Sequence, residues 1–71
     1  MTRDEWISKL AARLATKPPS AEEADALLRL AALAAHGAER TAAPLSTWLA
    51  ARSGQPLEEV LRAAAELSDE P

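Results

Sequence analysis

Cysteine is absent from this chain and histidine occurs once, so two common ways of stabilising a small domain are missing. Without cysteine there is no disulfide, and one histidine is too few for a structural zinc site. Phenylalanine and tyrosine are absent too, and more than half of the apolar residues are alanine. A chain of 71 residues forms one domain at most and buries only about 60% of its extended surface. This composition favours helices strongly and a large core weakly, which points to a partner or to self-association.

A basic patch and a long apolar run are also lacking. The net charge is −3, and the eight basic residues are scattered between Arg3 and Arg62, which excludes the electrostatic footprint of a nucleic-acid-binding protein. The first residues carry Asp4 and Glu5, unlike a secretory signal. The longest wholly apolar run, residues 30–35, is far shorter than the roughly 20 residues that span a bilayer. We therefore expect a cytoplasmic protein with no membrane or nucleic-acid partner.

The sequence does contain residues that typically start and end helices. Thr2 and Ser20 are each followed three residues later by glutamate, at Glu5 and Glu23, which is the spacing of a reciprocal helix cap. The prolines at 18 and 19 end the first helix, because a residue before proline is pushed out of the helical region. These signals predict helices over residues 3–16 and 21–36.

Two more helices follow from proline and glycine. Pro44 and Pro56 suit a first helical turn, where a missing N–H has no consequence, and Gly37 and Gly54 suit left-handed helix ends. The sequence thus predicts helices over 44–53 and 56–67. No segment alternates apolar and polar residues as a strand would. We predict an all-α fold, a compact four-helix bundle of short helices that forms a single domain over residues 1–71.

Helical spacing predicts which side chains face the core. The expected inward residues are Trp6, Ile7, Leu10, Ala11 and Leu14 in the first helix, Leu45, Trp48 and Leu49 in the third, and Leu57, Val60, Leu61, Ala64 and Leu67 in the fourth. In the second helix the apolar arc is unusually broad and leaves a narrow polar strip that includes Arg29 and His36, while Leu33 widens the arc. Such a helix is either central in its own domain or covered by a second protein.

Catalytic groups are scarce. Nucleophilic catalysis needs a positioned base, and His36 is the one imidazole; at a helix C-terminus it also suits the negative end of the helix dipole. Two glycines cannot build a phosphate-binding loop. We expect a protein that is not an enzyme, with no metal and no cofactor.

The connection between the second and third helices, residues 36–44, is the most distinctive segment. In one interpretation Arg40 donates to the free carbonyls that end helix two, and Glu39 accepts from the free N–H groups that open helix three. In the other, Arg40 and the N-terminus of helix three bind an anionic group on a partner or ligand.

A family resemblance rests on this same segment. Ala34-Ala35-His36-Gly37-Ala38-Glu39-Arg40, followed by Ala43-Pro44-Leu45 and Trp48-Leu49, resembles a small all-helical family of unknown function with the pattern AHGxER and APLxxFL. Its members occur in GC-rich bacteria, free-standing or fused to molybdenum-cofactor guanylyltransferase. This chain departs from the pattern at Thr41, where the family tends to have proline, at Trp48, where it tends to have phenylalanine, and at Arg52, where a small or apolar residue is expected.

The resemblance implies a molybdenum context. We expect a non-catalytic protein–protein interaction module, an accessory subunit or adaptor of a molybdenum-cofactor-dependent enzyme such as formate dehydrogenase, or of its cofactor maturation. Two alternatives stay open: a domain that binds an anionic or nucleotide-like ligand at the connection, and a homodimer formed through helix two. The candidate partner- or ligand-binding residues are His36, Glu39, Arg40, Pro44, Leu33, Arg29 and Trp48.

Overall fold

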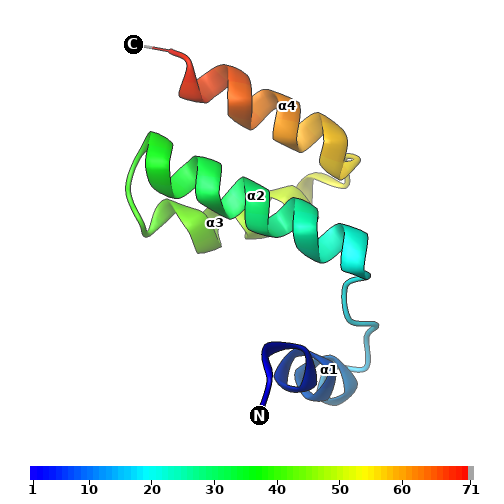
Figure 1. Cartoon of the computed structure of the whole chain (residues 1–71). Helices are drawn as coiled ribbons and strands as arrows, with labels where there is room; N and C mark the ends of the chain where they lie inside the picture. Colours follow the sequence, from blue (N-terminus) through cyan, green and yellow to red (C-terminus); the bar gives the residue numbers. More distant parts are fainter. Residues whose placement is uncertain (71) are drawn as a thin grey trace.

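The computed structural model describes residues 1–70, in which the chain forms four α-helices and no strand (Figure 1). The helices are α1 (Arg3–Arg13), α2 (Ala21–Gly37), α3 (Ala42–Ser53) and α4 (Leu57–Ser68). The predicted fold class, an all-α bundle of short helices, is confirmed. Among the described residues no helix has both the length and the apolar character needed to cross a membrane.

Local hydrogen bonds set the starts of α1 and α2. The Ser20 hydroxyl accepts from the Glu23 N–H at 3.1 Å, and the Glu23 carboxylate accepts from the Ser20 N–H at 2.8 Å, so the predicted reciprocal cap is complete. At α1 the Thr2 hydroxyl accepts from the Glu5 N–H at 3.1 Å, but the Glu5 carboxylate accepts from that hydroxyl rather than from the backbone. Both helices therefore begin where the sequence predicts.

Helix α1 ends earlier than predicted, at Arg13 rather than at residue 16. Ala15 adopts a left-handed conformation with φ 55°, and two hydrogen bonds close the helix end: Thr16 N–H to the Ala11 carbonyl and Ala15 N–H to the Ala12 carbonyl. This arrangement usually places glycine at the left-handed residue. Because alanine stands there instead, this helix end could not be predicted from the sequence.

The later boundaries also differ slightly from the prediction. Helix α3 starts at Ala42, not at Pro44, because the carbonyls of Glu39 and Arg40 already accept from the next helical N–H groups at 2.9 and 3.1 Å. Pro44 still lies in the first turn, where its missing N–H is not needed. The left-handed C-terminal turn occurs at Gly54, with φ 68°, as predicted.

Two further ends shift by one residue. Gly37 was expected to be a left-handed stop, but it is the last residue of α2 and has no positive φ. Pro56 precedes α4 as its N-cap, and its carbonyl accepts from the N–H groups of Glu59 and Val60, so the helix covers Leu57–Ser68 rather than 56–67. These shifts are of the size expected for helix ends that lack a strong side-chain cap.

Helix α2 is the centre of the structure. Both α3 and α4 pack against it, and its Leu30 is 3% exposed. On α4 the half-buried residues are Leu57, Val60, Leu61 and Ala64, as predicted, whereas Leu67 is 65% exposed. The broad apolar arc of α2 is therefore explained by two neighbouring helices within the same chain.

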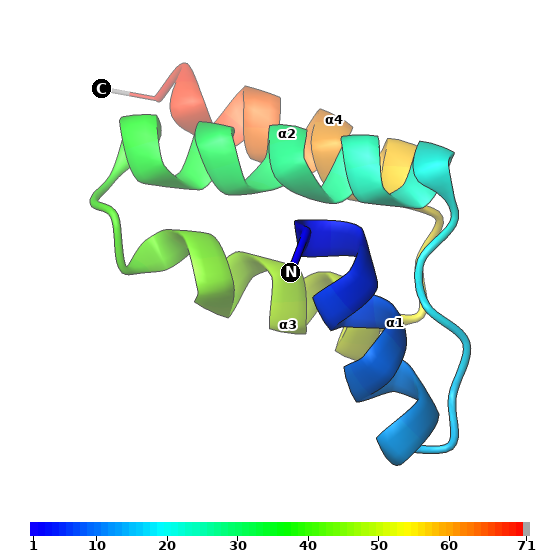
Figure 2. The ribbon, with the colours of Figure 1, turned by 60° about the horizontal axis from the view of Figure 1, so that its bottom comes forward.

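Helix α1 stands apart from the compact part formed by α2, α3 and α4. Figures 1 and 2 show α1 and α4 on opposite sides of α2, with α1 joined to α2 by residues 14–20, which begin with the turn at Ala15. The radius of gyration is 13.0 Å, against about 11 Å for a compact chain of this length. The difference reflects an elongated molecule of 41 × 24 × 17 Å.

The core is small. In the described part of the chain the residues that count as buried are Ala11, Leu30 and Ala50. The accessible surface is 5851 Å², whereas a compact monomer of 7.5 kDa exposes about 4,250 Å². The chain thus leaves about 1,600 Å² more surface in solvent than its mass requires.

Candidate interaction surface

Helix α3 packs against α2 with its small side chains. Ala50 is 4% exposed, and four other residues of α3, namely Ala42, Ala43, Ser46 and Thr47, are half-buried. Residues 43, 46, 47 and 50 follow the spacing of one helix face. A face of alanine, serine and threonine lets two helices approach closely, so this is the side that meets α2.

The hydroxyls on this face are satisfied within α3 itself. Ser46 donates to the Ala43 carbonyl at 2.7 Å, and Thr47 donates to the Pro44 carbonyl at 2.8 Å. A hydroxyl that bonds to its own helix can be half-buried without leaving an unpaired donor. Two polar residues can therefore lie on the inward side of α3.

The large apolar residues of α3 point the other way. Leu45, Trp48 and Leu49 are 66%, 58% and 59% exposed, and the guanidinium carbon of Arg52 lies 4.8 Å from the centre of the Trp48 ring. We call Leu45, Trp48, Leu49 and Arg52 the α3 stripe. The prediction that these apolar side chains face the core was wrong, because the opposite face of the helix was the one that fitted α2.

A second uncovered stripe lies on α1. Ile7 is half-buried and Ala11 is 6% exposed, so these two residues mark the side of α1 that faces the rest of the chain. Trp6, Leu10 and Leu14 are 55%, 38% and 64% exposed, although they were predicted to be inward; we call these three residues the α1 stripe. The apolar arc of α1 is wider than the strip that packs, and the remainder faces solvent.

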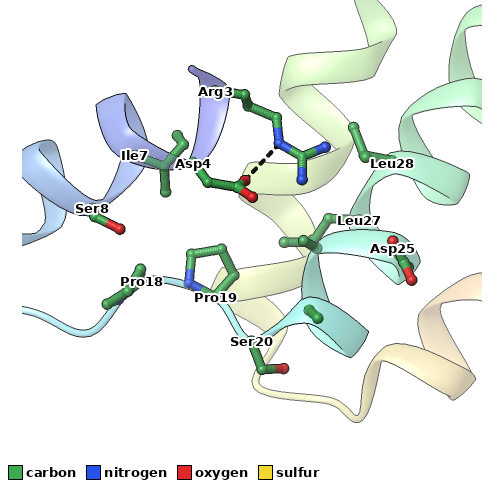
Figure 3. A pocket seen from close by; sticks show the side chains of 12 residues that line it. Arg3, Asp4, Ile7, Ser8, Pro18, Pro19, Ser20, Asp25, Leu27 and Leu28 are labelled. Carbon is green, nitrogen blue, oxygen red and sulfur yellow. Dashed lines mark hydrogen bonds and ion pairs between the residues drawn. The ribbon is translucent and has the colours of Figure 1, made fainter. Parts of the chain in front are cut away.

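A cleft of about 440 Å³ separates α1 from the start of α2 (Figure 3). Its apolar lining consists of Ile7, Pro18, Pro19, Ala21, Ala24, Leu27 and Leu28. At its rim Arg3 donates to the carboxylate of Asp4 at 2.9 Å, and Leu28 is 52% exposed. The cleft continues the apolar surface of α1 towards α2.

Three of the residues predicted to bind a partner or ligand do lie together. Arg29, Leu33 and His36 line a hollow of about 400 Å³ on α2, which Ser68 at the end of α4 also lines. Glu39 and Arg40 lie outside that lining, and Trp48 belongs to the α3 stripe. The seven predicted residues are therefore divided among the hollow, the connection and α3, and they do not form one site.

The connection itself is braced by its backbone. The carbonyls of Glu39 and Arg40 accept from the first N–H groups of α3, whereas the Glu39 carboxylate accepts a long hydrogen bond, 3.5 Å, from the Thr41 hydroxyl. The side chain of Arg40 is exposed, and no hydrogen bond or ion pair joins it to the described residues. The side-chain brace predicted between the two helix ends is therefore absent from the described residues, and the bonds that are present hold only the start of α3, through main-chain carbonyls.

Within the described residues no three His, Cys, Asp or Glu side chains are close enough together to hold a metal ion. The groups that stand out structurally are instead the α1 and α3 stripes. One sign of them was present in the sequence: in α3 the small residues at 43, 46, 47 and 50 oppose the large ones, so either face could have packed inward. For α1 no comparable sign distinguishes the part of its arc that packs.

Comparison with known proteins identifies the family and nothing finer. No curated protein and no solved structure matches the chain significantly. One family does match, over residues 1–70, and it is described as a domain of unknown function (DUF6457). This range includes all four helices and both stripes. The chain belongs to the DUF6457 family of domains of unknown function.

Proposed function

We propose that this protein is a non-catalytic protein–protein interaction module that docks through the apolar stripes of α1 and α3. The observation that carries the proposal is that both tryptophans of the chain, Trp6 and Trp48, are more than half exposed. Tryptophan is enriched among the residues that dominate binding energy at interfaces, and here each has two leucines beside it on its helix. In a monomer these two stripes stay in water and add no buried apolar area to the core.

Covering the stripes would stabilise a complex. Complete burial of a fully exposed large apolar side chain is worth about 1.5–3 kcal/mol, and each stripe has three such side chains that are 38–66% exposed and would gain a corresponding part of it. The largest apolar patch on a typical monomer is about 300–600 Å² and is often functional. A protein surface laid on either stripe would supply the burial that the small core of this chain lacks.

The partner we propose is larger and belongs to molybdenum enzymology. The module would be an accessory subunit or adaptor, in the cytoplasm, of a molybdenum-cofactor-dependent enzyme such as formate dehydrogenase, or of an enzyme that matures the cofactor. The support is the resemblance of the segment from Ala34 to Leu49 to a family that occurs fused to molybdenum-cofactor guanylyltransferase. A fusion keeps two domains close together through a covalent link. An adaptor keeps two proteins close together by binding, without such a link.

The test is direct binding. The full chain would be titrated by calorimetry into purified molybdenum-cofactor guanylyltransferase and formate dehydrogenase from the same organism. We expect one of them to bind, and we expect Trp6→Glu or Trp48→Glu to weaken that binding strongly. Leu67→Glu is the matched control, because Leu67 is 65% exposed on α4, away from both stripes.

Two results would contradict the proposal. If neither enzyme binds the chain, the molybdenum context is wrong. If a partner binds equally well to both stripe variants and to the control, then the stripes are not the docking surface, and the exposure of the two tryptophans does not support the proposal.

A further inference from the structure

We propose that Ala15 is a conformational switch that gives α1 two lengths and two directions relative to α2. In the short form, which the structure shows, α1 ends at Arg13 and Ala15 is left-handed with φ 55°. In the long form Ala15 returns to the right-handed helical region and α1 continues to Thr16. The two forms belong to the free chain, so this inference goes beyond the proposed function and does not need its partner.

Backbone strain at Ala15 makes the short form less favourable. Among the described residues Ala15 is the only one other than glycine that has a positive φ. In this conformation the Cβ of an L-residue crowds the following carbonyl, which lowers the population of the form about five- to thirtyfold. Glycine usually occupies this position at a helix end and avoids the penalty. Another contribution must therefore offset the strain in the short form.

The hydrogen bonds at the end of α1 favour neither form. In the short form the Ala15 N–H donates to the Ala12 carbonyl at 3.1 Å. The Thr16 N–H donates to the Ala11 carbonyl at 2.9 Å. A regular helix pairs each N–H with the carbonyl four residues earlier, so in the long form Ala15 donates to Ala11 and Thr16 donates to Ala12. The same donors and acceptors are satisfied in both forms, with the partners exchanged.

The sequence of residues 14–16 is compatible with the long form. Leucine and alanine are strong helix formers, and the Leu14 N–H already donates to the Leu10 carbonyl at 3.0 Å, as it would in a helix. The first residue that must leave the helical region is Lys17, because Pro18 follows it. The long form therefore ends where the sequence requires an end, and the short form ends before that point.

Packing of α1 is what holds the short form, and this packing is slight. In the described chain the helix pairs that pack extensively are α2 with α3 and α2 with α4, and α1 is in neither pair. The packed side of α1 consists of Ile7, which is half-buried, and Ala11, which is 6% exposed. Half-burial of one isoleucine is comparable in free energy to the strain at Ala15. Neither form therefore has a large advantage over the other.

The change at Ala15 alters the direction of α1. Its φ moves from 55° to about −63°, a rotation of roughly 120° at the junction between α1 and the segment that leads to α2. Residues 17–19 make no backbone–backbone hydrogen bond in the described chain, so no such bond fixes the direction of α1. Pro18 and Pro19 line the cleft on one side of this junction and Ile7 lines it on the other (Figure 3). The form that Ala15 adopts thus sets the width of the cleft.

The switch would regulate the α1 stripe, and this one step rests on the proposed function. In the short form Leu14 is the residue that caps α1, whereas in the long form it lies within the helix, in line with Trp6 and Leu10. A partner that binds the stripe more tightly in one form shifts the population towards that form, by as much as its two affinities differ. Docking and the direction of α1 would then be coupled.

A distance measurement on the free chain tests the two forms. The chain has no cysteine, so spin labels can be attached at Lys9→Cys and Ala65→Cys alone. Both positions are exposed, and they lie on α1 and α4, on opposite sides of α2 (Figures 1 and 2). Pulsed electron paramagnetic resonance should show two distances between the labels. In the unlabelled chain, carbon chemical shifts of Ala15 should lie between the left-handed and the helical values.

Two substitutions at Ala15 should shift the populations in opposite directions. Ala15→Gly removes the strain and should raise the ratio of short to long form about fivefold or more. Ala15→Val should leave the long form alone, because a β-branched residue is an outlier in the left-handed region. Ala12→Gly is the matched control: it places glycine at an exposed position of the same helix, where no left-handed residue is relieved, and should leave the ratio unchanged. Far-UV circular dichroism should show that all three variants stay folded.

Failure of this inference and failure of the proposed function can be told apart. A single distance that is the same in the unmodified chain, in Ala15→Gly and in Ala15→Val overturns the inference, and so does an unmodified chain that has only the distance found in Ala15→Gly. Two distances without any binding partner leave the inference standing and remove the proposed partner. Equal affinity of a partner for Ala15→Gly and Ala15→Val overturns the regulatory step, because docking is then independent of the switch.

Discussion

Replacing Ala50 with leucine tests the orientation of α3 most sharply. Ala50 is 4% exposed and lies on the small face that meets α2, so a leucine there inserts three further heavy atoms where the helices are in contact. Overpacking of this kind lowers the free energy of unfolding by about 1–3 kcal/mol. For a domain of this size each kcal/mol shifts the melting temperature by about 4–8 °C.

The matched change is Trp48→Ala on the opposite face. Truncating a tryptophan that is packed in the core to alanine lowers the free energy of unfolding by about 3–5 kcal/mol. Trp48 is 58% exposed and its particular contact is the stacking of Arg52, worth about 0.5–1 kcal/mol at an exposed site. Alanine is also the better helix former. We therefore expect Trp48→Ala to lower the free energy of unfolding of the monomer by less than about 1 kcal/mol.

Urea unfolding followed by far-UV circular dichroism would measure both variants. Circular dichroism is preferable to fluorescence, because Trp48→Ala removes one of the two fluorophores. The chains should be kept at a concentration where sedimentation shows only monomer, so that self-association does not enter the free energy of unfolding. If Trp48→Ala is the more damaging change and Ala50→Leu is tolerated, the described packing of α3 is refuted.

Other changes test the helix ends and the connection. Ser20→Ala removes the reciprocal cap of α2 and should lower the free energy of unfolding by about 1 kcal/mol in a thermal melt; an unchanged melt would contradict the role of the cap. Ala15→Gly relieves a left-handed alanine and should slow amide hydrogen exchange in α1, stabilising that helix end by about 1 kcal/mol, whereas faster exchange would argue against the left-handed turn. An added Cβ at Gly37 would lie 3.0 Å from the Ser68 hydroxyl, so Gly37→Ala should stabilise α2 more in a Ser68→Ala background than alone; equal effects in urea unfolding would mean that this contact is absent. Arg40→Ala should change the free energy of unfolding by no more than about 0.5 kcal/mol, because its side chain is exposed and bonds to none of the described residues; a larger loss would give that side chain a structural role.

The positions of the helices could be predicted because their signals are local. The Ser20 cap and the left-handed turn at Gly54 act within a few residues of themselves, and the structure contains both where they were predicted. The premature end of α1 escaped prediction for the same reason. A left-handed turn at a helix end is usually predicted from a glycine, and here alanine occupies that position.

The candidate surface was predicted less well than the fold. Arg29, Leu33 and His36 proved to be neighbours because they lie at helical spacing on one helix, which periodicity can reveal. Main-chain carbonyls perform the role predicted for the Glu39 side chain, whereas the donation predicted from Arg40 to the end of α2 is not found among the described residues. The spacing argument placed Trp48 in the core, which was wrong because its side chain is 58% exposed, and its role as a contact residue stays a prediction.

What the sequence by itself determined is therefore the number of helices, their approximate limits and the apolar side chains each one carries. What only the tertiary structure decided is which of two usable faces of α3 meets α2, and how little of α1 packs at all. The physical reason is that helix formation depends on residues a few positions apart, whereas the choice of which helix face packs inward depends on the shape of the neighbouring helix. Here the small face with Ala50 is the one that meets α2, and Trp48 is left in solvent.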